Sequence, residues 1–115
     1  MKELRLYLYS TIKGSRPRKG AYTYVLEMDT KKGPVTLSKT EVVEEMTAHR
    51  AELISFIAAL KRILKSSRLI IYTDSHYLAV NTRDCLTSWK KNDWKTARGN
   101  QIKHKEEWQE IYSLI

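Results

Sequence analysis

The sequence predicts an α/β fold in which helices flank a mixed sheet. Three observations lead to this prediction. Apolar and polar side chains alternate through most of the first 44 residues, as in strands, and apolar side chains recur at helical spacing after Thr47. A short, nearly all-apolar run, LIIYT at residues 69–73, then follows. Because a helix that joins two strands of one sheet forms a crossover, this order predicts an antiparallel three-strand meander plus one parallel strand.

The meander is expected in the N-terminal third. Leu4, Leu6 and Leu8 would share one face of its first strand. Two glycines, one proline and four cations mark residues 11–20 as a loop, and residues 29–34 form a turn. The three expected strands cover residues 4–9, 21–28 and 35–44.

The sequence predicts mainly helices after residue 46. Thr47 is a good N-cap for a helix over residues 47–65, which residues 66–68 would end. Its apolar stripe consists of Leu53, Ile57, Leu60 and Leu64. The LIIYT run suits a buried central strand. The remaining expected elements are a helix over residues 76–88, a polar cationic segment over 89–105 and a helix from about 103 to the end.

Length and composition indicate one folded domain over residues 1–115. Hydrophobic residues make up 42% of the chain and charged residues 30%, which excludes a disordered or fibrous protein. The single cysteine excludes an internal disulfide and a cysteine-built zinc site. No apolar run approaches the ~20 residues of a membrane span, and the N-terminus lacks a signal-peptide pattern. We therefore expect a soluble, cytoplasmic protein.

The charge balance points to a polyanionic partner. Twenty-one lysines and arginines stand against thirteen acids, which gives a net charge of +8 at pH 7. Each phosphate that such a cation neutralises releases condensed counterions, so the excess favours nucleic acid. On charge alone, an anionic membrane surface is the competing partner.

Two acids stand at positions that packing alone does not favour. Glu52 lies early in the expected helix, and Asp74 directly follows the 69–73 strand, at the strand end where α/β sheets bind ligands. Together they could supply oxygen ligands to a hard cation. The alternatives are that Glu52 is a solvated acid near the helix N-terminus and that Asp74 is an N-cap.

The stretch WKKNDWKTAR at residues 89–98, called the basic segment below, is a candidate nucleic-acid contact. Its cations could hold a sugar–phosphate backbone while its two indoles contact sugars or bases. The alternative is that both indoles anchor the segment to its own domain. The expected binding residues here are Trp89, Lys90, Lys91, Trp94, Lys95, Thr96 and Arg98.

Four stretches together resemble type 1 ribonuclease H. IYTDSHY at residues 71–77 is similar to the family's central strand-and-turn motif, and TAHRAEL at 47–53 is similar to the start of its first helix. WKKNDWKTA at 89–97 is similar to its basic protrusion, which holds the hybrid duplex, and EWQ at 107–109 to its C-terminal helical motif. The resemblance implies a ribonuclease H-like mixed sheet, and it places Thr47 and Arg50 among the residues expected to contact nucleic acid.

The resemblance also implies hydrolysis of the RNA strand of RNA/DNA hybrids by two Mg²⁺ ions that four carboxylates hold. Glu52 matches the second carboxylate and Asp74 the third. The first falls on Ser10, or on Tyr9 if the register slips, so no acid stands there. The fourth lies in the family on a last helix after a fifth strand, and the chain is expected to lack both because it ends at Ile115.

This loss is expected to weaken catalysis more than binding. Two cations about 3.5–4 Å apart repel strongly unless anionic ligands bridge them. With Glu52 and Asp74 alone, we expect at most one weakly held Mg²⁺. The sequence therefore predicts a domain that binds RNA/DNA hybrid or another duplex, with hydrolysis lost or strongly reduced.

Three further expectations stay open. The chain could be an active nuclease that receives its missing carboxylates from a second chain, or an interaction domain that uses the fold for protein contacts. Without a fifth strand, residues 69–73 would form a sheet edge, which favours self-association. We therefore also expect a homodimer with Ile70 or Tyr72 near the contact.

Overall fold

A long antiparallel hairpin forms one side of the sheet, and a short parallel strand forms its opposite edge. The computed structural model describes residues 3–63 and 68–115, and within these ranges it contains four strands in the order β3-β2-β1-β4. The strands are β1 (Glu3–Ser10), β2 (Arg18–Thr30), β3 (Gly33–Met46) and β4 (Arg68–Thr73). β1 pairs antiparallel with β2 and parallel with β4, which confirms the predicted mixed sheet.

Side-chain alternation gives the sheet two different faces. Leu6 and Leu8 of β1 pair with Leu26 and Tyr24 of β2, and all four side chains are buried on the face that α1 covers. The intervening residues, such as Tyr7 and Tyr9, point to the second face and are exposed. In the part of the chain that the structure describes, no helix packs on this second face.

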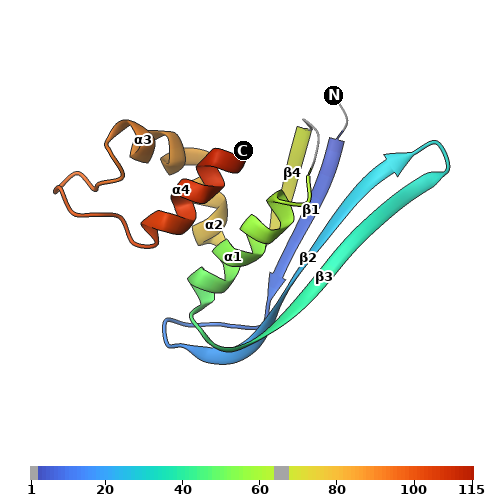
Figure 1. Ribbon diagram of the computed structural model, residues 1–115, viewed down its shortest axis with the longest axis horizontal. Helices are drawn as coiled ribbons and strands as arrows, with labels where there is room; N and C mark the ends of the chain where they lie inside the picture. Colours follow the sequence, from blue (N-terminus) through green and yellow to red (C-terminus); the bar gives the residue numbers. More distant parts are fainter. Residues whose placement is uncertain (1–2, 64–67) are drawn as a thin grey trace.

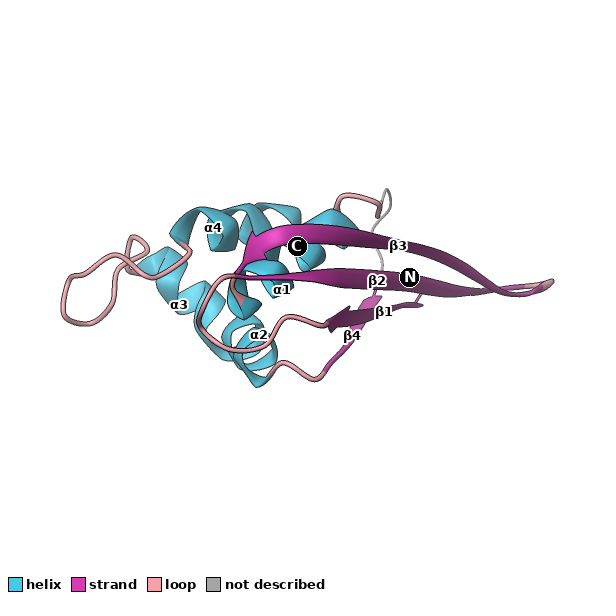
Figure 2. Ribbon diagram, turned by 90° about the horizontal axis from the view of Figure 1, so that it is seen from below, coloured by secondary structure: helices cyan, strands magenta, loops and turns pink. Residues whose placement is uncertain are grey.

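The helices gather on one side of the molecule, and the β2–β3 hairpin extends away from them (Figures 1 and 2). They are α1 (Ala48–Leu60), α2 (His76–Val80), the π-helical turn η1 (Asn81–Cys85), α3 (Leu86–Lys91) and α4 (Lys105–Leu114). α1 packs on β1 and β2, and α4 packs on α1. Leu53, Phe56, Trp108 and Ile111 from these two helices are fully or almost fully buried in the core. None of the described helices is long and apolar enough to cross a membrane.

The loop after β1 is held against the sheet and the first helix. Ile12 is buried with Tyr22, Ala48 and Ala51 in a small second cluster. Gly20 allows this close approach, because a Cβ atom at that position would lie 2.6 Å from Cγ1 of Ile12. The loop therefore has a defined position beside the N-terminus of α1.

The strands of the hairpin are longer than the sequence predicts. The expected turn over residues 29–34 is reduced to Lys31 and Lys32, because Gly33 adopts a positive φ of 113° and Thr30 Oγ1 donates to the Gly33 carbonyl. At the other end, β2 begins inside the segment expected to be a loop. A register shift between Arg18 and Gly20 lets the strand continue past this point.

The helical predictions need two corrections. The first helix ends at Leu60, where Arg62 N–H donates to the Ala59 carbonyl in a tightened last turn, while Leu64 and Lys65 of the predicted helix lie outside the described residues. The predicted helix over 76–88 is three consecutive pieces that run on to Lys91.

The packing of two leucines explains the π-helical turn η1. Leu78 and Leu86, eight positions apart, would lie about 80° apart around a regular α-helix. The wider turn between them lets both side chains be buried in the same core.

The prediction of a buried central strand at residues 69–73 is wrong, because β4 lies at the sheet edge and none of its residues is fully buried. Its apolar residues instead divide between the two faces. Leu69 and Ile71 pack toward the core, whereas Tyr72 lies on the second face and stacks on Tyr7, with ring centroids 4.8 Å apart.

Candidate functional site

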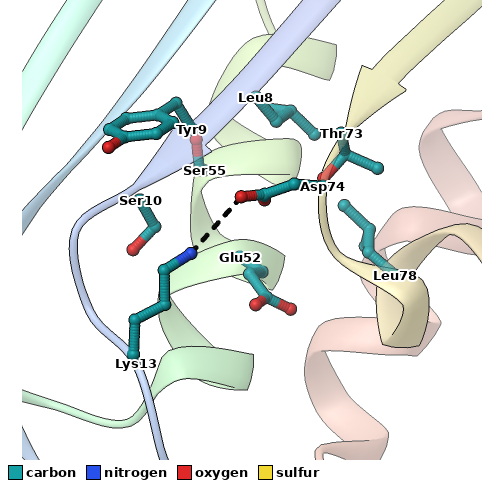
Figure 3. A pocket seen from close by; sticks show the side chains of 9 residues that line it. All are labelled: Leu8, Tyr9, Ser10, Lys13, Glu52, Ser55, Thr73, Asp74 and Leu78. Carbon is teal, nitrogen blue, oxygen red and sulfur yellow. Dashed lines mark hydrogen bonds and ion pairs between the residues drawn. The ribbon is translucent and has the colours of Figure 1, made fainter.

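The two predicted acids meet Ser10 at one end of the sheet. β1 and β4 run parallel with Leu8 opposite Thr73, so Ser10 and Asp74 follow at the same end. Glu52 reaches the same place from α1, which packs over this end of the sheet. All three residues line one small pocket (Figure 3). The structure therefore brings together residues that stand far apart in the sequence.

Glu52 is fixed by the helix that follows β4. Its Oε2 accepts a hydrogen bond of 2.6 Å from Ser75 Oγ, and Ser75 Oγ in turn accepts one of 3.0 Å from Leu78 N–H. Ser75 is thus the N-cap of α2, the role that the sequence left open for Asp74. One oxygen of the Glu52 carboxylate is consequently already in a hydrogen bond.

Asp74 forms an ion pair with Lys13. The ammonium Nζ lies 3.4 Å from Oδ2, and both side chains are largely exposed, at 65% for Lys13 and 62% for Asp74. Figure 3 shows the lysine side chain reaching from the loop after β1 toward this carboxylate. A cationic side chain therefore stands at the carboxylate that matches the family's third acid.

Two serines form the inner part of the pocket. Ser10 is buried, and its Oγ accepts a hydrogen bond of 3.1 Å from Ile12 N–H. Ser55 of α1 is 2% exposed, and its Oγ has no hydrogen-bond partner within the described chain. The pocket, which is open on one side, measures about 10 Å³, close to the space that one water molecule needs.

This set of groups does not fit the two-ion arrangement that the resemblance implies. A serine hydroxyl stands at the end of β1, where the resemblance places an acid. One carboxylate is paired with an ammonium and the other with a hydroxyl. No group of three or more His, Cys, Asp or Glu residues placed to hold a metal occurs in the described ranges. Two ions at the short distance of a two-metal site would lack the bridging anions that they need.

A wider groove of about 530 Å³ opens beside the acids. It shares Lys13, Glu52 and Asp74 with the small pocket and continues along the N-terminal ends of α1 and α2. Its other charged or titratable residues are His49, His76, Tyr77, Lys103 and His104. The groove is therefore a mixed surface in which cations and acids lie together.

Aromatic contacts build one wall of this groove. The Tyr77 ring stacks on His49, with centroids 3.7 Å apart, and its hydroxyl accepts a hydrogen bond of 3.0 Å from Trp108 Nε1. Burial raises the pKa of Tyr77, and the hydrogen bond from Trp108 partly opposes this. Burial also lowers the pKa of His104, another residue of the groove. Tyr77 is thus held as a neutral hydrogen-bonded ring at neutral pH.

The basic segment lies on the far side of the helices from the sheet, in α3 and the loop that follows it (Figures 1 and 2). Trp94 is only 6% exposed, and its ring makes an edge contact with Tyr112. Trp89 is half-buried and packs edge-on against Trp108. The burial of Trp94 favours anchoring over contact with bases or sugars, the two alternatives that the sequence left open, whereas half-buried Trp89 keeps part of its ring accessible.

The polar residues of the segment face water. The exposed cations are Lys90, Lys91, Lys95 and Arg98. Thr96 is also exposed, and it shapes the loop because its backbone N–H donates to Asn100 and its Oγ1 accepts from Asn100 N–H. Exposed cations are thus presented on α3 and on the loop after it, which buried Trp94 and half-buried Trp89 anchor.

Thr47 and Arg50, the two residues at the start of α1 that were expected to contact nucleic acid, lie away from the basic segment (Figure 1). Thr47 is the N-cap of α1, and its Oγ1 accepts a 3.4 Å hydrogen bond from Arg50 N–H. Arg50 is more than half exposed, with Nε 3.7 Å from Glu107 Oε1 of α4. Thr47 borders the groove, whereas the Arg50 guanidinium lies toward α4.

Sequence patterns do not single out Lys13, Ser55 or Ser75 as site residues. In the sequence, Lys13 is only one of four cations in an expected loop. Ser75 stands out only as a cap and Ser55 not at all, because a serine inside a helix carries no motif. Only the three-dimensional arrangement places these side chains at the acids.

Comparisons with known proteins identify the fold and then the family. The structure matches the crystal structure of LC9-RNase H1, a type 1 RNase H with the type 2 active-site motif, with a TM-score of 0.80 and 20% sequence identity. The match covers 99% of this chain and 58% of that chain. The structure also matches a foamy viral protease-reverse transcriptase solved in complex with RNA/DNA hybrid, with a TM-score of 0.74 and 18% identity over 98% of this chain and 15% of that one. These likenesses show the ribonuclease H-like fold.

Sequence comparison shows the family. The family model described as RNase H matches residues 5–115, and the ribonuclease H of Francisella tularensis subsp. novicida is 39% identical over 71 residues. That match covers 62% of this chain and 47% of the relative, so the chain spans about half the length of the curated relatives it matches. The chain belongs to the ribonuclease H family.

Proposed function

We propose that this chain binds nucleic-acid duplexes, RNA/DNA hybrid above all, and that its hydrolytic activity is lost or strongly reduced. One observation carries the proposal. Within the described ranges, the exposed cations of the basic segment form no ion pair with an acid, whereas both carboxylates of the acid site are engaged, by Lys13 and Ser75. The surface suited to phosphates is thus better preserved than the groups suited to metal ions.

Binding is supported by the placement of charge. Lys90, Lys91, Lys95 and Arg98 project from one anchored segment, so they can contact successive phosphates without the segment having to order first. The net charge of +8 favours the approach of a polyanion. The foamy viral relative in fold was solved with RNA/DNA hybrid, which supports the same class of ligand for this chain.

The roles that we propose follow from these positions. The four cations and Thr96 contact the backbone of the duplex, while Trp89 and Trp94 position the segment. Thr47 and Arg50 would extend the contact surface along the start of α1. Glu52 and Asp74 correspond, by resemblance, to two of the family's catalytic carboxylates, and they hold at most one Mg²⁺ weakly.

Reduced hydrolysis is supported by the chemistry of the site. Ser10 offers a neutral hydroxyl that already accepts a backbone hydrogen bond, so it cannot bridge two cations as a carboxylate does. A divalent ion at Asp74 would also have to displace or repel the Lys13 ammonium. A second chain that brings carboxylates to this pocket would restore the set, and this is the alternative that a cleavage assay separates.

The binding proposal is tested with two matched lysine pairs. Lys90 and Lys91 are adjacent and exposed in α3, and Lys31 and Lys32 are adjacent at the hairpin tip, far from the helices (Figure 1). Each pair is replaced by glutamine, so that both variants lose the same charge. Affinity for a labelled RNA/DNA hybrid is then measured by fluorescence anisotropy across a salt series.

We expect the Lys90→Gln, Lys91→Gln variant to bind more weakly than the hairpin-tip variant at every salt concentration. Its slope of log affinity against log salt should flatten by roughly 0.9 for each phosphate that the protein no longer neutralises, as for B-DNA. Equal weakening in the two variants would mean that only net charge matters, and unchanged binding in both would remove the basic segment from the interface.

A further inference from the structure

Lys13 stands at the acid site where the family's chemistry requires a divalent cation. We propose that the Lys13 ammonium takes the place of that cation at Asp74, and that it makes the site a metal-independent contact for a phosphodiester group of the bound strand. The inference rests on the proposed function for its ligand, while its claim about Asp74 and Lys13 can be tested without nucleic acid.

The backbone on both sides of Lys13 is fixed. Ile12 is buried and donates its N–H to Ser10 Oγ, and the Gly14 carbonyl accepts a 3.3 Å hydrogen bond from Ala48 N–H at the start of α1. Gly14 also has a positive φ of 89°, a conformation that suits glycine. Lys13 is therefore carried by a loop that is tied to β1 and to α1, and its side chain starts from a defined position.

The charges around Lys13 leave room for a phosphate. The groove contains two carboxylates, Glu52 and Asp74, and two ammonium groups, those of Lys13 and Lys103. With neutral histidines these charges cancel, so a phosphodiester can approach without the repulsion that two bare carboxylates would exert. A divalent ion at the same place would meet the repulsion of a nearby ammonium instead.

The exposure of the Lys13–Asp74 ion pair determines how much Lys13 lowers the affinity of the site for a metal ion. Because Lys13 and Asp74 are both mostly solvated, their attraction is modest, and a divalent ion at millimolar concentration can still compete. Lys13 should therefore lower metal affinity several-fold and leave a weak site. Substitution of this exposed side chain should also leave the fold intact.

The first experiment measures metal binding alone. Mn²⁺ is titrated into the full chain and its bound fraction is followed by electron paramagnetic resonance, for the original protein and for Lys13→Gln. We expect Lys13→Gln to bind Mn²⁺ about 1.5–5-fold more tightly, as expected when an exposed ion pair is removed, and Lys13→Gln with Asp74→Asn to lose that gain. Lys31→Gln, which removes the same charge at the hairpin tip, is the control and should change nothing.

The second experiment measures duplex binding at constant ionic strength in EDTA and in MgCl₂. We expect the original protein to bind RNA/DNA hybrid equally in both, within about twofold, and Lys13→Gln to bind several-fold more weakly in EDTA and to recover part of its affinity in MgCl₂. Unchanged Mn²⁺ affinity in Lys13→Gln would overturn the inference. Absence of hybrid binding by any variant would instead overturn the proposed function, while the Mn²⁺ titration would still decide the role of Lys13.

Discussion

His104 shows how a single residue is constrained at the edge of the groove. It stands at the N-terminus of α4 with a left-handed backbone (φ 60°, ψ 36°), a conformation that non-glycine residues seldom adopt. Its imidazole is partly buried, and burial is the main reason why its pKa lies below the ordinary value. The charges of Lys103, His49 and Arg50 lower the pKa further, and Glu107 opposes them.

This shift predicts a pH dependence of stability. The folded protein binds the His104 proton less readily than the unfolded chain does, so the free energy of unfolding should decrease as the pH falls below about 6.5. His104→Asn keeps a residue that tolerates the left-handed backbone and removes the titration. We expect the drop in melting temperature between pH 7.5 and pH 5.5 to be smaller in His104→Asn than in the original protein. An equal drop in both proteins would assign the effect to other groups.

Three residues of the site show what a sequence can reveal and what it cannot. Glu52 and Asp74 could be predicted because each lies in a contiguous stretch whose order suggests an acid at a helix start or a strand end. Lys13 could not, because its partner Asp74 is 61 positions away and only the parallel pairing of β1 and β4 brings the two ends together. The roles of these residues in binding remain predictions.

The contact between the loop after β1 and the strand β2 decides where Lys13 stands. A Cβ atom at Gly20 would lie 2.6 Å from Ile12 Cγ1 and 2.8 Å from Thr11 Oγ1, far inside normal contact. Ile12 is buried, so it has little room to move away. The absence of a side chain at Gly20 is thus a requirement of this packing.

Gly20→Ala should therefore destabilise the fold by about 1–3 kcal/mol, because overpacking outweighs the smaller entropic gain of replacing glycine. Urea unfolding of Gly20→Ala, Ile12→Ala and the double variant forms a thermodynamic cycle. We expect the cost of Gly20→Ala to shrink in the Ile12→Ala background, because Cγ1 is then absent. A cost that is the same in both backgrounds would show that the two residues do not press on each other.

The elements themselves were predictable where the pattern is local. Alternation places the strands of the hairpin, and the apolar repeat together with the Thr47 cap places α1. The π-helical turn could not be predicted, since it depends on both Leu78 and Leu86 finding the same core. The edge position of β4 does not follow from its apolar run, which reads alike in a central strand and in an edge strand; it was expected only from the resemblance, because no fifth strand was expected beside residues 69–73.

The second face of the sheet is an open surface of the molecule, with Tyr7, Tyr9 and Tyr72 exposed on it. It carries the Tyr7–Tyr72 stack, and beside it Arg5 forms ion pairs with Glu27 (2.7 Å) and Asp29 (3.0 Å). The hydrogen bond from Arg5 lowers the pKa of Asp29. Within the described chain, β4 has no strand on its outer side.

Because the outer edge of β4 is unpaired within the described chain, we propose a homodimer that pairs through this edge, near Ile70 and Tyr72. Light scattering should show a mass that rises with concentration in the micromolar range, and Tyr72→Lys should shift it toward the monomer, because a lysine on an edge strand discourages pairing. Val42→Lys, on the opposite edge strand β3, is the matched control and should leave the mass unchanged. A monomeric mass at all concentrations would contradict the proposal.

We propose that this chain binds duplexes as its family does but cleaves them little or not at all. The most direct measurement is cleavage of a labelled RNA/DNA hybrid, in Mg²⁺ and in Mn²⁺, by the original protein and by the Glu52→Gln, Asp74→Asn variant, at concentrations where anisotropy shows the hybrid to be bound. We predict that the original protein binds the hybrid and cleaves it no faster than the variant. A metal-dependent product that only the original protein forms would contradict the claim.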